Sequence, residues 1–207
     1  NGGKIKELFT PEAMKVKSDN PFKGNIDIKR LEELIVSSGV QNIPFIRMEA
    51  STNLIGGQPY SMENMKQVRQ VADKYGLNIV LDASLLGENA YFIMKREKGY
   101  ENKSIAYIIK EMCDLSDIVY FSARQITSSR GGAICTNNPD LYYQMRDLVP
   151  LYEGFLTYGG MSIREIEAMT VGLRETIMED VVGQSPSFIS YMVKELDKLG
   201  IPVIMPG

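Results

Sequence analysis

Apolar positions repeat with the spacing of an α-helix in several separate stretches of the chain. After Asp27, the residues Leu31, Leu34 and Ile35 fall on one helical face, and Gly39 ends the pattern. An aspartate can accept hydrogen bonds from the amides of a first helical turn, and glycine commonly ends a helix. We therefore predict a helix between Asp27 and Gly39.

The same spacing predicts further helices downstream. Ser61 and Asn138 stand where they can cap two of them, and "SIRE", residues 162–165, has the Ser-x-x-Glu spacing of a capping box. The predicted helices cover 61–76, 88–97, 104–115, 138–149, a stretch that begins at 162, and 187–199.

Short apolar runs separate these helices and predict strands. They are "NIPFIRMEA" (42–50), "NIVLDAS" (78–84), "DIVYFSA" (117–123) and "GAICT" (132–136). Strands that alternate with helices are typical of an open, mainly parallel sheet flanked by helices. We predict this α/β fold for residues 26–207, after an irregular segment, residues 1–25, in which "NPFKGN" is a surface loop.

Composition narrows the possible functions. The 207 residues contain 23 Lys and Arg against 26 Asp and Glu, which is not the basic excess of a nucleic-acid surface. No stretch is long and apolar enough for a membrane span. The chain has no histidine, and histidine is both the usual base of a Ser-His-Asp hydrolase and the commonest zinc ligand. We expect no nucleic acid, membrane or metal as a partner.

The two cysteines are too far apart in sequence for a CxxC motif. We interpret Cys113 and Cys135 as free thiols that serve packing more often than chemistry. Free thiols favour a reducing compartment, and no secretory signal is visible, so we expect a cytoplasmic protein.

Three polar residues follow the predicted strands closely. Asn53 precedes Gly56 and Gly57, a pair that more often makes a turn than a ligand site. Asp82 ends an apolar run, where it either caps the next turn or faces a cationic ligand group. Ser122 stands at the tip of the third strand. Because ligand crevices of open parallel sheets lie at the carboxyl ends of the strands, these residues predict a site with an amide, a carboxylate and a hydroxyl.

Several longer motifs occur together and in a fixed order. They are "NPFKGNIDIKRLEELI", "NLIGGQPYSMENM", "LDASLLGENAYFI", "GYENKSI", "YEGFLTYGGMS" and "EAMTVGLRE". In this order and at these separations they closely resemble the middle of tyrosine phenol-lyase and tryptophanase, the pyridoxal-phosphate-dependent β-eliminating lyases. The resemblance covers nearly the whole chain. It implies the large domain of the aspartate-aminotransferase type, fold type I of the pyridoxal-phosphate enzymes.

The resemblance also assigns roles to single positions. Asp82 matches the carboxylate that pairs with the pyridinium nitrogen of the cofactor, and Asn53 matches an asparagine near its ring oxygen and the substrate carboxylate. Ser122 matches the serine whose hydroxyl touches the cofactor phosphate. Tyr158, in "TYGG", matches a tyrosine near the active site. The family therefore implies pyridoxal phosphate as cofactor and a small aromatic amino acid as substrate.

The sequence departs from the family pattern where the cofactor would be anchored. In the family, the lysine that forms the Schiff base follows the strand-tip serine. Here that position is Gln125 when counted from Ser122 and Arg124 when counted back from the double glycine, and neither side chain can form a Schiff base. Residues 111–193 contain no lysine. The family arginine three residues after Asp82 is Leu85 in this chain, so covalent attachment of the cofactor is doubtful.

Two hypotheses follow for the function. One is a carbon-carbon lyase that acts on an aromatic amino acid. The other, favoured by the missing lysine, is a catalytically silent homologue that acts as a binding or oligomer-forming protein; non-covalent binding of the cofactor by Asp82, Asn53 and Ser122 is a third, weaker possibility. The resemblance further implies a homo-oligomer, a dimer or tetramer. It also implies that the family's flanking segments, an N-terminal one and a small C-terminal domain, are absent from this chain.

Overall fold

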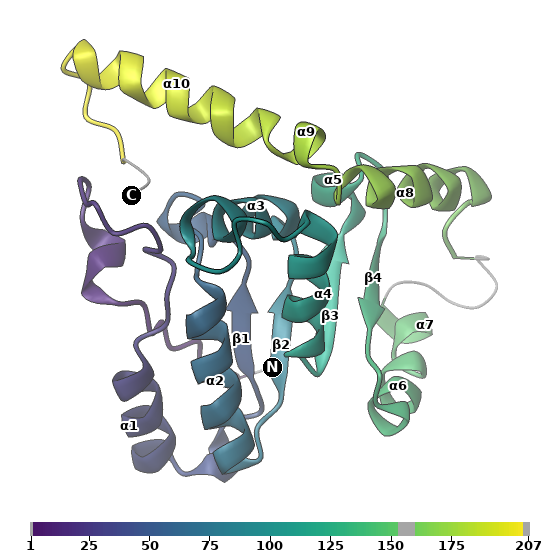
Figure 1. Cartoon of the computed structure of the whole chain (residues 1–207). Coiled ribbons are helices and arrows are strands. Elements are labelled where there is room, and N and C mark those ends of the chain that lie inside the picture. Colours follow the sequence, from purple (N-terminus) through teal and green to yellow (C-terminus); the bar gives the residue numbers. More distant parts are fainter. Residues whose placement is uncertain (1, 153–159, 205–207) are drawn as a thin grey trace.

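A four-stranded sheet forms the centre of the molecule (Figure 1). The computed structural model describes residues 2–152 and 160–204. The strands are β1 (Ile46–Glu49), β2 (Ile79–Asp82), β3 (Ile118–Ser122) and β4 (Gly132–Cys135), side by side in the order β1-β2-β3-β4. The first three strands are parallel and β4 is antiparallel to β3. The prediction of a mainly parallel sheet is confirmed.

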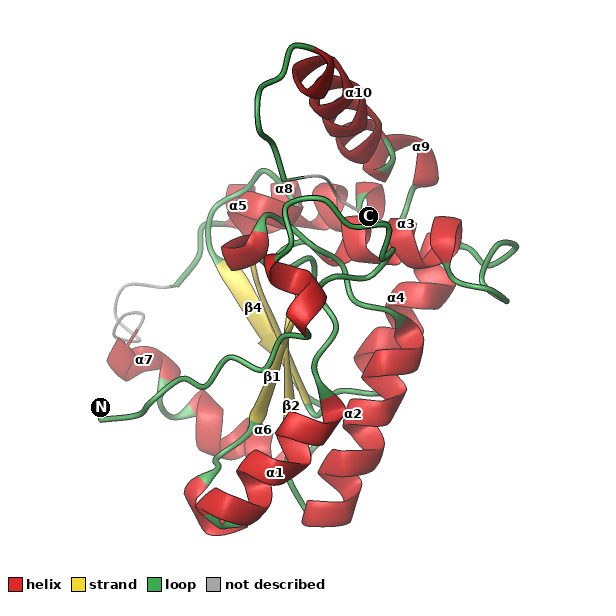
Figure 2. Cartoon of the chain, turned by 90° about the vertical axis from the view of Figure 1, so that its left-hand side faces the viewer, coloured by secondary structure: helices red, strands yellow, loops and turns green. Residues whose placement is uncertain are grey.

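Helices connect the strands and extend the chain beyond β4. The α-helices are α1 (Ile28–Ser38), α2 (Met62–Tyr75), α3 (Leu86–Arg96), α4 (Ile105–Asp114), α5 (Ala123–Ile126), α6 (Pro139–Arg146), α7 (Val149–Tyr152), α8 (Ile163–Glu175), α9 (Glu179–Val182) and α10 (Gln184–Lys198). Short 3₁₀ turns η1 (Pro11–Met14), η2 (Val40–Asn42) and η3 (Asn53–Ile55) interrupt the loops. Figure 2 shows α2 and α4 to one side of the strands. No helix among these described residues is long and apolar enough to cross a bilayer.

Side-chain caps start several helices as the sequence predicted. The side chains of Asp27, Ser61 and Asn138 each accept a backbone N–H from the first turn of α1, α2 and α6. The predicted capping box of α8 is only half formed: Ser162 accepts the amide of Glu165, but the Glu165 carboxylate accepts from Ser129 and Arg130 instead. Glu165 therefore links α8 to the loop after α5.

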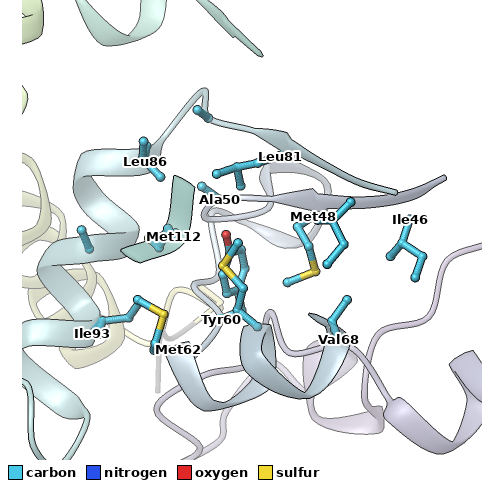
Figure 3. Packing of buried hydrophobic residues seen from close by; sticks show 14 of the residues in the cluster. Ile46, Met48, Ala50, Tyr60, Met62, Val68, Leu81, Leu86, Ile93 and Met112 are labelled. Atoms are coloured by element: carbon cyan, nitrogen blue, oxygen red, sulfur yellow. The ribbon is translucent and has the colours of Figure 1, made fainter. Parts of the chain in front are cut away.

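The main core lies between the helices and one face of the sheet (Figure 3). Met48 and Leu81, from β1 and β2, pack there with Met62 and Val68 of α2, and all four side chains are buried. Successive strand side chains point to opposite faces, so residues next to Met48 and Leu81 in sequence face the other way. This second face carries Arg47, Asp82 and Tyr120.

The segment "NPFKGN" is not the surface loop that the sequence predicted. Phe22 is 6% exposed and belongs to the core cluster, and Lys23 is fully buried. The Gly24 amide donates to the carbonyl of Pro59, and the Asn64 side chain exchanges two hydrogen bonds with the backbone of Ile26. Polar residues broken by a proline and a glycine indicated a loop, but hydrogen bonds to the Pro59 carbonyl and the Asn64 side chain hold the segment against the core.

A buried asparagine fixes the loop between β1 and α2. Asn89, on α3, is fully buried; its side-chain oxygen accepts the amides of Ser51 and Tyr60, and its nitrogen donates to the Tyr60 carbonyl. Ser51 holds a positive φ of 51°, an uncommon conformation outside glycine. Asn89 thus holds in place the loop that carries Asn53.

Replacing Asn89 with leucine should destabilise the protein strongly. The change leaves three backbone groups without partners in the core, and an unsatisfied buried group costs about 1–3 kcal/mol. We expect the free energy of unfolding, measured by urea denaturation, to fall by about 3 kcal/mol or more. The matched change at the exposed Asn102 should stay within about 0.5 kcal/mol of wild type. Equal losses in the two variants would contradict this role.

Candidate functional site

The carboxylate of Asp82 lies at the centre of the candidate site, at the end of β2. Its Oδ2 accepts from the Arg47 guanidinium at 2.5 Å and from the Tyr120 hydroxyl at 2.7 Å. Its Oδ1 accepts from the hydroxyl and the amide of Ser84, at 2.6 and 3.1 Å. The side chain is 8% exposed. Donors from β1, β3 and the following loop therefore surround one carboxylate.

The register of the sheet explains why these side chains meet. Asp82 lies opposite Glu49 on β1 and opposite Tyr120 on β3, while Arg47 lies opposite Val80. Residues two apart on a strand share a face, so a long side chain from position 47 can reach across to the neighbouring strand. Arg47 also contacts Glu49 at 3.3 Å. The cluster joins three parallel strands on the face away from the core.

The surroundings of Asp82 favour its charged form. Burial alone would raise the pKa of this carboxyl, but hydrogen bonds from Ser84, Tyr120 and Arg47 outweigh burial and lower the pKa below its ordinary value. Burial and the hydrogen bond to Asp82 raise the pKa of the Tyr120 hydroxyl to about 12. At neutral pH the cluster holds an ionised aspartate and a neutral tyrosine.

Asn53 is exposed at the start of η3, close in sequence to this cluster. Its amide donates to the Glu49 side chain at 3.1 Å, which links the loop to β1. Gly56 and Gly57 follow at φ values of 85° and 73°, and the Gly57 amide donates to the carbonyl of Thr52. The glycine pair therefore closes a turn, as the sequence predicted.

The residues at the predicted anchor position lie on the single turn of α5, directly after β3. Arg124 and Gln125 are both exposed, and Ser122 is half-buried at the strand tip without capping the turn. Ser122 pairs with Gly132, where a Cβ atom would lie 2.2 Å from the Phe121 carbonyl oxygen. Only glycine fits so close to the neighbouring strand.

The loop after α5 is tied to its neighbours at several points. The Thr127 hydroxyl donates to the Ala123 carbonyl, and the Ser129 hydroxyl donates to the Glu165 side chain and carbonyl, both at 2.9 Å. The Thr176 hydroxyl, just beyond α8, donates to the carbonyl of Ile126. The stretch "SARQITSSRGG" thus contains an ordered turn against α8, in which the hydroxyls of Thr127 and Ser129 serve structure.

Two other positions from the sequence fall outside this cluster. Leu85, where the family has an arginine, precedes α3 and is half-buried without a cap hydrogen bond. Tyr158 lies outside the described residues. Cys113 and Cys135 are both free and line an apolar cavity of about 340 Å³ on the core side of the sheet, away from Asp82.

The arrangement does not fit pyridoxal phosphate held as the resemblance implies. A carboxylate has about four lone-pair positions, and the four donors around Asp82 fill them. A pyridinium nitrogen would have to displace one of these donors. At the position where the resemblance implies an amine, the α5 turn carries the amide of Gln125 or the guanidinium of Arg124.

Sequence reasoning missed Arg47, Glu49 and Tyr120, although a signal was present. The run "FIRMEA" places charged residues at alternating positions within an apolar stretch. Such alternation indicates a strand with one polar face. The sequence did not say that this face meets Asp82, because the strand register decides it.

Comparison with known proteins agrees with the motifs. The family model described as "Beta-eliminating lyase" matches residues 1–205. Tyrosine phenol-lyase from Lacrimispora saccharolytica is 40% identical over the whole chain, and that from Fusobacterium nucleatum is 37% identical. The chain spans 44% and 45% of these two relatives.

Solved structures support the fold. Threonine aldolase from Leishmania major superposes with a TM-score of 0.54 and 15% identity, over 88% of this chain and 48% of that one. N-acetylornithine aminotransferase from Stenotrophomonas maltophilia superposes with a TM-score of 0.52 and 15% identity, over 86% of this chain and 45% of that one. The fold is the aspartate-aminotransferase type that the sequence predicted. With the family match over nearly its whole length, the chain belongs to the β-eliminating lyase family.

Proposed function

We propose that this protein is a catalytically silent member of the lyase family, which keeps the fold but does not form the covalent cofactor link. The single observation that carries the proposal is the α5 turn. By the resemblance, the position of the family's lysine falls on Gln125 or on Arg124, and both residues lie on this turn. An amide nitrogen is not nucleophilic, and a guanidinium stays protonated, so neither reacts with an aldehyde as a lysine amine does.

The rest of the chain supports this proposal. No lysine stands between residues 111 and 193, so none on β3, α5, β4 or α8 can replace the missing one. Hydrogen bonds from Ser129 and Thr127 order the turn without any amine. The turn is therefore ordered by hydroxyl groups of its own residues, although it carries no lysine.

Self-association is the role that the surface favours for a silent member. Large apolar side chains are exposed on the helices after β4: Tyr152 on α7 at 75%, and Phe188 and Tyr191 on α10 at 70% and 66%. Exposed apolar surface of this extent marks an interaction surface in a soluble protein. We propose a homo-oligomer, a dimer or tetramer, in which a second copy covers these helices.

The alternative function is the family's lyase reaction on a small aromatic amino acid. Relatives named tyrosine phenol-lyase favour it, and so does the retention of Asn53, Asp82 and Ser122. This alternative requires an amine that the site described above does not supply.

Borohydride trapping separates the two functions. The protein is incubated with one equivalent of pyridoxal phosphate and reduced, so that any amine-bound cofactor stays on its peptide for mass spectrometry. We expect weak labelling spread over exposed lysines, and no phenol or indole from L-tyrosine or L-tryptophan. Near-stoichiometric label on one lysine peptide, or release of the ring product, would show that the protein is an active lyase.

Returning an amine to the α5 turn should recreate the anchor. We expect the Gln125→Lys variant to take up reducible label at residue 125 above every other lysine, because this position directly follows the carboxyl end of β3. The matched control is Gln144→Lys, at an exposed position on α6. Equal labelling of the two new lysines would mean that position 125 is not the anchor position.

A further inference from the structure

One of the donors to Asp82 is a cation that the chain itself supplies, the guanidinium of Arg47. Arg47 Nη2 lies 2.5 Å from Asp82 Oδ2 and 3.3 Å from a Glu49 carboxylate oxygen. A guanidinium remains protonated at any physiological pH, so the positive charge that Arg47 brings to Asp82 does not depend on pH. The ion pair is half-buried: the Arg47 side chain is 42% exposed and that of Asp82 is 8% exposed.

Donors from three separate parts of the fold hold the same carboxylate. Arg47 comes from β1 and Tyr120 from β3, while Ser84 follows β2 itself. Parallel strands already pair through their backbones, and the cluster adds charge-assisted hydrogen bonds across them at the strand ends. A hydrogen-bond donor on a ligand would have to displace one of these donors before it could bond to the Asp82 carboxylate.

We propose that Arg47 takes the place of a ligand's cation at Asp82, so that the carboxylate joins β1, β2 and β3 and is closed to a ring nitrogen. The inference deepens the proposed function, on which it rests, by identifying Arg47 as the residue that excludes the family's cofactor. Arg47 is a positioning residue: it acts by holding Asp82, and Tyr120 supports it from the other side.

A cofactor analogue without an aldehyde tests this closure. Pyridoxine 5′-phosphate carries the same ring nitrogen and phosphate but cannot react with an amine, so its binding does not depend on any lysine. Its dissociation constant is measured by equilibrium dialysis for wild type, Asp82→Asn, Arg47→Met and the double variant. Arg146→Met is the control, because Arg146 is exposed and contacts its α6 neighbours Asp147 and Tyr143, away from Asp82.

The proposal predicts a specific pattern across these variants. Asp82→Asn should leave wild-type binding unchanged within about twofold, and Arg47→Met should bind about tenfold tighter, because a charge-assisted hydrogen bond to the opened carboxylate becomes possible. This tighter binding should disappear when Arg47→Met is combined with Asp82→Asn. Weaker binding by Asp82→Asn alone, or no gain in Arg47→Met over Arg146→Met, would overturn the proposal.

Thermal unfolding provides a second readout that needs no ligand. Asp82→Asn and Arg47→Met should each lower Tm by about 2–4 °C or more, because each removes a charge-assisted hydrogen bond across the strands. Tyr120→Phe should lower Tm less, because it removes a neutral donor. If Asp82→Asn has the Tm of wild type, the carboxylate does not join the strands. Labelled lysine in the trapping experiment would instead overturn the proposed function and leave these results untouched.

Discussion

The site depends on one interaction, the hydrogen bonding of the Asp82 carboxylate by donors from three neighbouring structural elements. A buried charge is tolerated only when it is paired and hydrogen-bonded. Arg47, Tyr120 and Ser84 meet both conditions. The strand register brings these side chains together, and the register is set by the apolar face of the same strands. The packing of the core thus determines which polar side chains meet on the opposite face of the sheet.

Two features of the structure bear on the same ligand at two separate places. At α5, the proposed function places Gln125 or Arg124 where the family has its lysine, and neither side chain can form the covalent link. At β2 the carboxylate is hydrogen-bonded by the chain's own Arg47. The two proposals each predict impaired cofactor binding, and they rest on different elements. Together they predict a changed role for a chain that keeps the family's motifs.

The sequence predicted the fold well because its signals were local. Asp27, Ser61 and Asn138 cap the helices that their neighbours predicted, and the strand runs contain all four strands. Local signals failed for "NPFKGN", whose burial depends on a distant carbonyl at Pro59, and for Glu165, which bonds to Ser129 rather than to its own helix. In both cases a tertiary partner outweighed the local pattern.

The candidate site was predicted in part. Their places at strand ends led to Asp82, Ser122 and Asn53, and the resemblance gave each a role; the loss of the lysine at Gln125 or Arg124 stays a prediction. The partners of Asp82 were not predicted, because contact between Arg47, Asp82 and Tyr120 depends on how β1 and β3 align with β2. A residue's own sequence neighbours carry no information about that alignment.

The most direct measurement is a pH titration of the Asp82 carboxyl carbon by NMR, in wild type and in Arg47→Met. If Arg47, Tyr120 and Ser84 hold the carboxylate, its pKa lies below the ordinary aspartate value of 3.8 and rises when the guanidinium is removed. Because the pKa of Asp82 is lowered on folding, the ionised carboxylate adds to the free energy of unfolding at pH values above 3.8. This addition is lost as the pH falls through the lowered pKa. A wild-type pKa at or above 3.8, unchanged by Arg47→Met, would contradict the account.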